Sequence, residues 1–259
     1  MLRIREEQVA VFEQAALRNF EDRMIEHLRD FAPTHSKLLT EDEMRIVIRH
    51  GIKQAESHGF TSERSIRIYT ELILMLGSSF DTDPQLPWAA ELLKDEPLTD
   101  QVMRSDRLQE RAWEYVDEVL PEFDNTEDES SLLSFNNHNS ELRQERNEAL
   151  RPVATAEFYQ RMSTKLEQAL PRKCELLGQQ GLRRLVNRGI ELARSYNITT
   201  ERGCAFFVAG MFMLGSGFDK DPRLPWIVRI LNDQSLRDQK KRVDQLFAAS
   251  KTALERLPR

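Results

Sequence analysis

Two short acidic motifs have the spacing of metal-ligating residues. They are Asp81 with Asp83 in GSSFDTDPQLPW (residues 77–88) and Asp219 with Asp221 in GSGFDKDPRLPW (residues 215–226). Carboxylates one residue apart can supply part of the oxygen shell of Ca²⁺ or Mg²⁺. A proline follows each pair directly, and neither Gly nor Glu comes at EF-hand spacing. Because Asp also stabilises turns by accepting backbone N–H bonds, we interpret these segments as structural corners and expect no metal and no other cofactor.

Two further pairs of residues recur and are candidates for binding. Each acidic turn closes on a tryptophan, Trp88 or Trp226, just inside the next predicted helix, where the indole should pack into the core. An acid–base pair also begins a predicted helix twice, as Glu63 with Arg64 and as Glu201 with Arg202. Charges in a first turn usually compensate the helix dipole or pair with a structural partner, so we expect a structural role here too.

The other reactive side chains form no recognisable catalytic constellation. His50 and His58 lie eight residues apart, too far for a metal-binding pair on one helix turn. No phosphate-cradling glycine loop, serine nucleophile elbow or Cys-x-x-Cys motif is present. The two cysteines, Cys174 and Cys204, cannot form a disulfide framework and suit a reducing cytoplasm. We therefore expect a protein that is not an enzyme.

The acidic turns belong to a longer internal repeat. Shifting the chain by 138 residues aligns 44–95 with 182–233 without a gap, with 21 identities in 52 positions. The match continues outward from Phe20 on Phe158 to Pro33 on Pro171. This pattern predicts an all-α fold of two tandem homologous helical-bundle units with a period of 138 residues and a pseudo-two-fold relation. A corner that is used twice would be kept twice.

Helical periodicity predicts the elements of each unit. In the first unit, Phe20, Met24, Leu28 and Phe31 predict a helix over about 5–31 that Pro33 stops. Thr40 and Glu43 form a capping box for a second helix. Gly59 is expected to end that helix, and Asn197 stands at the equivalent position of the second unit. Both residues tolerate the left-handed conformation of a helix C-terminus.

Three more helices complete each predicted unit. Thr61 and Thr199 are expected to cap a third, central and most apolar helix. A short helix follows Pro87 or Pro225, since proline favours the first helical position. A last helix is expected from about residue 99.

Charge is distributed unevenly between the predicted units. The net charge is -6, but the first half is acidic and the second is basic. The expected domains are residues 1–121 and 141–259, joined by an acidic, Ser- and Asn-rich linker over 122–140. Two interpretations fit this pattern: the halves attract each other weakly at long range, or they carry two solvated faces of different charge.

Several classes of partner are disfavoured. The basic stretch RDQKKRVDQ at 237–245 carries no interleaved aromatic residues, so we expect no nucleic-acid partner. The longest apolar run, 204–215, is far shorter than the ~20 residues needed for a membrane span. The first residues carry charge and no apolar signal region, which predicts no signal peptide.

Three stretches of the first half resemble a family of largely uncharacterised bacterial helical proteins that are often encoded beside type VI secretion components and effectors. They are IREEQVAVFEQAALRNFEDRMIEHLRDFAP, IRHGIKQAESHGFTSER and MLGSSFDTDPQLPWAAELLKD. The resemblance covers nearly all of each half and transfers no catalytic residue. It implies single-unit proteins, so the two units of this chain are a departure from the family.

The resemblance and the lack of a catalytic motif together favour an interaction protein. The first hypothesis is a cytoplasmic partner of a secreted antibacterial toxin, either an immunity protein or an adaptor, whose acidic half suits a basic toxin surface. The second is a structural or assembly module of a secretion apparatus. The third is a metal-dependent effector that uses the duplicated Asp pairs.

Overall fold

The structure is a computed structural model, and it describes residues 6–94, 100–119 and 156–256, with side chains from residue 11 onward. These residues form helices, turns and no strand, which confirms the all-α prediction. In the first half the helices are α1 (Glu6–Phe31), α2 (Pro33–Ser36), α3 (Glu41–Ser57), α4 (Glu63–Leu76), α5 (Pro87–Lys94) and α6 (Gln101–Val119), with a 3-10 turn at Phe80–Thr82. In the second half they are α8 (Ala156–Ala169), α9 (Pro171–Ser195), α10 (Glu201–Leu214), α11 (Pro225–Asn232) and α12 (Gln239–Glu255), with a 3-10 turn at Phe218–Lys220.

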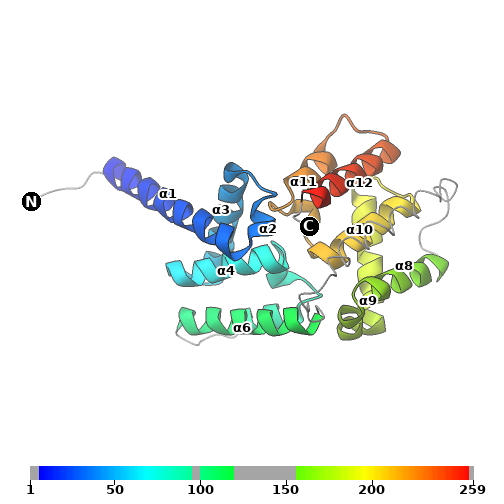
Figure 1. Cartoon of the computed structure of the whole chain (residues 1–259), viewed down its shortest axis with the longest axis horizontal. Coiled ribbons are helices and arrows are strands. Elements are labelled where there is room, and N and C mark those ends of the chain that lie inside the picture. Colours follow the sequence, from blue (N-terminus) through cyan, green and yellow to red (C-terminus); the bar gives the residue numbers. More distant parts are fainter. Residues whose placement is uncertain (1–5, 95–99, 120–155, 257–259) are drawn as a thin grey trace, which may run out of the picture.

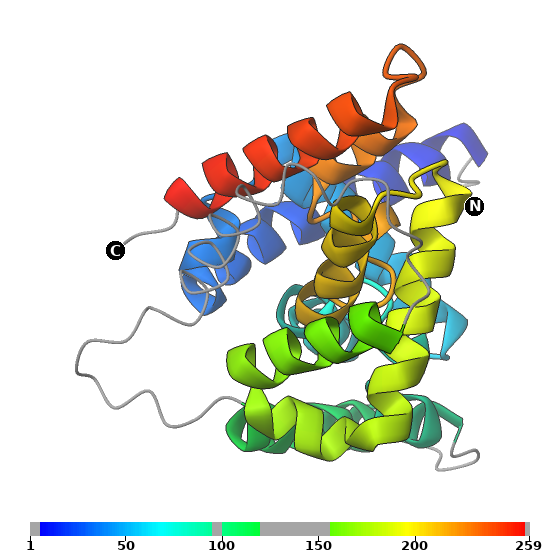
Figure 2. The ribbon, with the colours of Figure 1, turned by 90° about the vertical axis from the view of Figure 1, so that its right-hand side faces the viewer.

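Each half packs its helices around one central apolar helix. In the first half α4 contacts α1, α3 and α6, and in the second α10 contacts α8, α9 and α12. Figure 1 shows the two halves side by side, and Figure 2 shows α10 between α12 above and α8 below. A helix that is apolar on most sides must be surrounded by others, which explains the central position predicted for this element.

Small residues set the closest approach to the central helix in both halves. A methyl group added at Gly51 would come within 2.5 Å of the Thr70 hydroxyl oxygen, and one at Gly189 within 2.6 Å of Val208. Gly51 and Gly189, like Thr70 and Val208, are 138 residues apart. The same contact therefore joins α3 to α4 and α9 to α10.

The predicted helix ends agree with the structure except at the third helix. Thr40 and Glu43 form the capping box, and Gly59 and Asn197 have positive φ angles of 78° and 58°. The prediction for Thr61 and Thr199 was wrong, because the caps of α4 and α10 are the residues that follow, Ser62 and Thr200. The backbone N–H groups of Thr61 and Ser62 instead donate to the Gln101 side chain of α6, at 2.6 and 2.8 Å. Sequence spacing alone could not reveal that tertiary contact.

The region between the first two predicted helices also differs from expectation. The short helix α2 follows α1 in the first half, whereas in the second half the two helical segments of α9 take the places of α2 and α3. Gly178 interrupts α9 with φ 62° and ψ 170°, which is a kink that glycine accommodates without a Cβ penalty.

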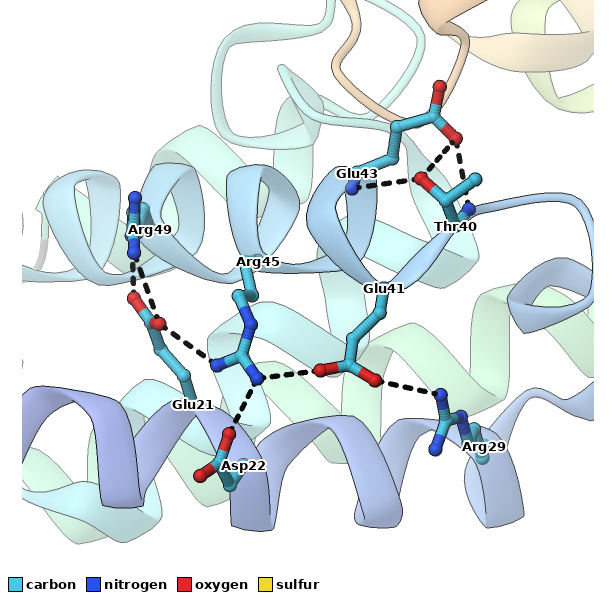
Figure 3. A network of polar contacts seen from close by, with 8 residues as sticks. All are labelled: Glu21, Asp22, Arg29, Thr40, Glu41, Glu43, Arg45 and Arg49. Carbon is cyan, nitrogen blue, oxygen red and sulfur yellow. Dashed lines mark hydrogen bonds and ion pairs between the residues drawn. The ribbon is translucent and has the colours of Figure 1, made fainter.

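A charged network fastens α1 to α3 (Figure 3). Glu21 of α1 is 1% exposed and accepts hydrogen bonds from Arg49 at 2.6 Å and Arg45 at 3.2 Å. Burial raises the pKa of Glu21, but the two arginines outweigh that effect and hold it below its usual range. Arg45 also donates to Asp22 and Glu41, each at 2.7 Å. This buried carboxylate is therefore stabilised by charged donors from the neighbouring helix.

The structure bears differently on the predicted linker and on the predicted lack of a membrane span. The predicted linker over 122–140 lies outside the described residues. Among the helices that are described, none is both long and apolar enough to cross a bilayer.

Candidate functional site

The two acidic turns meet at the junction between the halves. Asp83 accepts a hydrogen bond from the Ser216 backbone N–H at 2.7 Å and another from the Ser216 hydroxyl at 2.6 Å. Asp221 accepts one from the Ser78 backbone N–H at 3.0 Å. The second Asp of each motif therefore caps a backbone group of the other half, and the contact is reciprocal.

Asp83 and Asp221, the two aspartates that bond across the junction (the crossing aspartates), are also held within their own turns. Asp83 accepts the Gln85 backbone N–H at 2.9 Å, and Asp221 accepts that of Arg223 at 2.8 Å. These are the turn-stabilising bonds expected from the sequence. The contact with Ser216 could not be predicted, since nothing local indicates that the two turns face each other.

The residue two positions after each crossing Asp also spans the junction. The Gln85 amide donates to the Met211 carbonyl at 2.7 Å, and the Arg223 guanidinium donates to the Leu74 carbonyl at 2.8 Å. Arg223 forms an ion pair with Asp221 at 2.7 Å, and both side chains are at least 90% buried. Gln85 and Arg223 occupy the same position of the two motifs, but only Arg223 is charged. The two sides of the junction therefore differ in charge.

Two glycines allow the backbones to approach at this junction. Gly77 and Gly215 end α4 and α10 with φ angles of 114° and 101°. A methyl group at Gly77 would lie 2.9 Å from the Leu214 carbonyl oxygen, and one at Gly215 would lie 3.2 Å from that of Leu76. Both the backbone conformation and the space therefore require glycine.

The first Asp of each motif stays within its own half. Asp81 accepts hydrogen bonds from Tyr69 and His58, each at 3.0 Å, and Asp219 accepts one from Tyr196 at 2.8 Å. Burial raises the pKa of Asp81, but the donors His58 and Tyr69 outweigh it and leave the pKa below its ordinary value. The Asp81 side chain is 8% exposed, and burial also raises the pKa of Tyr69.

The tryptophan that closes each motif contributes to the packing around the core. Trp88 and Trp226 are partly buried and pack against the core, as the sequence predicted. The Trp88 ring lies 6.1 Å from that of Tyr115, and the Arg111 guanidinium lies 5.6 Å from its centroid. The indoles thus fix the start of the helix after each corner.

The repeated Glu–Arg pairs each contact other helices of their own half. Glu63 accepts both bonds of Arg23 at 2.8 and 2.9 Å, and Arg64 donates to Asp106 at 2.8 Å. The equivalent pairs of the second half are Glu201 with Arg161 and Arg202 with Asp244. The structure does not bring these pairs to the acidic turns.

A buried lysine near the junction escaped the sequence analysis. Lys173 of α9 is 9% exposed, and its ammonium donates to the Phe212 carbonyl and lies 4.9 Å from the Phe212 ring centroid. Burial lowers its pKa to about 8, against the opposing influence of Asp83. Its place at the start of α9, two residues after Pro171, gives no sequence signal of this burial.

The geometry assigns structural contacts to all four aspartates. Each carboxylate accepts hydrogen bonds from protein donors, which occupy lone pairs that a cation would need. No cluster of three or more His, Cys, Asp or Glu side chains suited to a metal forms in the described ranges 6–94, 100–119 and 156–256. The site is thus a hydrogen-bonded seam between two helical bundles.

Comparison of the chain with protein-family models, with curated proteins and with solved structures gave no significant match.

Proposed function

We propose that this chain is a non-enzymatic protein-binding protein. In this proposal it acts in the bacterial cytoplasm as the immunity or adaptor partner of a type VI secreted antibacterial toxin. The expectation that the chain is not an enzyme is supported by the hydrogen-bonded seam between the two bundles. In the one motif with the spacing of a metal site, Asp83 instead accepts a hydrogen bond from Ser216, and Asp221 accepts one from Ser78. Because these aspartates are occupied in joining the two bundles, we assign binding of a partner to the outer surface of the chain.

The proposal includes an origin of the two halves from one duplicated unit. It is supported by contacts that recur with both partners shifted by 138 residues. Gln101 accepts from the Thr61 N–H, and Gln239 accepts from the Thr199 N–H. Arg64 pairs with Asp106, and Arg202 pairs with Asp244.

The toxin class rests on the family resemblance of the sequence and on the acidic first half. A strongly charged inhibitor captures an oppositely charged partner faster, and it needs a complementary surface rather than a reaction. We propose a basic toxin as the partner for that reason.

Co-expression tests this function. A toxin gene adjacent to the gene for this chain should kill bacteria when expressed alone and be tolerated with this chain if the chain is an immunity protein. An adaptor would leave toxicity intact and raise secretion of the toxin. If the chain neither protects, nor alters secretion, nor binds the purified toxin by calorimetry, the proposal is wrong.

The second candidate function is a structural module of the secretion apparatus. The reciprocal seam favours it, because a rigid pair of bundles suits an assembly. It predicts that deletion of the gene abolishes secretion of all effectors rather than of one.

A further inference from the structure

An exposed tryptophan on α6 lies above a polar cluster that belongs to the first half alone. Trp113 is 44% exposed, and its ring meets Phe31 of α1 edge-on at 6.2 Å. Phe31 stacks on His27 at 6.0 Å. His27 contacts the carboxylate of Glu71, which is 4% exposed and also accepts from Gln109 at 2.9 Å. Phe31 thus links the indole of α6 to the contact between His27 of α1 and Glu71 of α4.

The second half shows that the fold does not need this cluster. Its residues 138 positions later are Lys165, Ala169, Ala209, Phe247 and Lys251. There Phe247 packs against Phe206 at 5.2 Å, with the Arg202 guanidinium 4.3 Å from its centroid. A buried carboxylate is costly unless donors compensate it, so apolar packing would be the cheaper solution for the first half as well. The cluster is therefore particular to the first half and is not a requirement of the fold.

The rim of Trp113 has the charge of a site for a cation. Asp106, Glu110, Trp113 and Asp117 follow one another at spacings of three and four residues, so they form one stripe of α6. Asp106 is paired with Arg64 at 2.8 Å. Glu110 and Asp117 are exposed on either side of the indole, and neither forms an ion pair with a described residue. The equivalent stripe in α12 carries Lys251 at the position of Trp113, where its ammonium lies 3.6 Å from Glu255.

We propose that Trp113, with Glu110 and Asp117, is the contact point for an arginine side chain of a protein partner. A guanidinium can stack on the indole and donate to both flanking carboxylates, and tryptophan is the best aromatic acceptor for such a cation. The edge contact with Phe31 limits the motion of the ring, which reduces the ordering cost of binding. This inference rests on the proposed protein-binding function and identifies the surface that performs it.

The test measures binding of a nine-arginine peptide to the full chain by calorimetry at low and at 0.15 M salt. Trp113→Lys installs the residue of the second half, and Glu110→Gln with Asp117→Asn removes the two flanking charges. Each should weaken binding at least tenfold. Because these positions lie on the surface, the midpoint of urea unfolding should change little.

Matched controls separate this site from a general charge effect. Leu176→Lys makes the same change of charge at another exposed apolar residue, 54% exposed on α9. Asp42→Asn with Glu56→Gln removes two exposed charges from α3. Both controls should keep affinity within about twofold of the parent chain. Equal losses in the controls and in the Trp113 variant, or binding that is indifferent to Trp113, would overturn the proposal.

Failure of this surface can be told apart from failure of the proposed function. The Trp113→Lys chain is co-expressed with the adjacent toxin. Protection by the parent and loss of protection by the variant support both. Equal protection by parent and variant keeps the function and rejects this surface. If peptide binding depends on Trp113 but neither the parent nor the variant protects against the toxin, the surface is kept and the toxin is rejected as the partner.

Discussion

Asp83 and Ser216, which lie 133 residues apart in the chain, are joined by two hydrogen bonds of 2.7 and 2.6 Å. The carboxylate is 4% exposed, so it satisfies the backbone N–H and the hydroxyl of the opposite half away from water. A buried donor left without a partner costs about 1–3 kcal/mol, and more when a charge is involved. This contact therefore couples the folding of one half to the other.

Asp83→Ala is expected to lower the free energy of unfolding by about 2–4 kcal/mol, because it leaves Ser216 N–H unpaired at the seam. Asp221→Ala should cost at least as much, since it also strands the Arg223 guanidinium, which is 90% buried. Urea unfolding followed by circular dichroism measures both. Asp42→Asn on the surface of α3 serves as the control. If Asp83→Ala and Asp221→Ala lower the free energy of unfolding no more than this control does, the two aspartates do not couple the halves.

Gly77→Ala should destabilise the chain more than Gly178→Ala. Both glycines have positive φ, but an added methyl meets the Leu214 carbonyl at 2.9 Å from Gly77 and no atom within 4 Å from Gly178. Gly178→Ala thus measures the backbone penalty alone, about 1–3 kcal/mol. Gly77→Ala should exceed it by at least about 1 kcal/mol in thermal or urea unfolding. Equal costs would mean that the two halves do not approach closely in solution.

Asp81 should make stability depend on pH in the acid range. Its pKa in the folded chain is below the ordinary 3.8, so the stabilisation is complete above about pH 4 and is lost as the pH falls through the folded value. Asp81→Asn should therefore be less stable than the parent at pH 7, with the difference shrinking below pH 4. Unfolding curves at a series of pH values test this. A difference that stays constant down to pH 2 would argue against an ionised Asp81.

Lys173 should give a second rise of stability with pH, in the alkaline range. Its pKa is about 8 in the folded chain and 10.5 when unperturbed, so the unfolded chain binds the extra proton between these values. Stability should then rise with pH from about 8 to 10.5 and be lowest below 8. Lys173→Met should remove that rise while keeping the volume of the side chain. If parent and variant show parallel profiles, the ammonium is not desolvated as described.

The amino-acid sequence by itself determined the helical class, most helix ends and the recurrence of the corners. These features depend on contacts within a few residues, such as the Thr40–Glu43 capping box or the left-handed Gly59 and Asn197. Local chemistry also predicted that Asp83 would accept a backbone N–H from its own turn. It went wrong at Thr61, where a side chain from α6 takes the backbone donors.

The tertiary structure alone decided which half each aspartate addresses. Asp81 and Asp83 are one residue apart, yet the first binds Tyr69 of its own half and the second binds Ser216 of the other. It also gathered Phe31, Glu71 and Trp113 from three helices. Such contacts depend on how whole helices dock, and docking is set by the summed shape and charge of large surfaces. No spacing along the chain encodes that sum, so these partners became visible only in the fold.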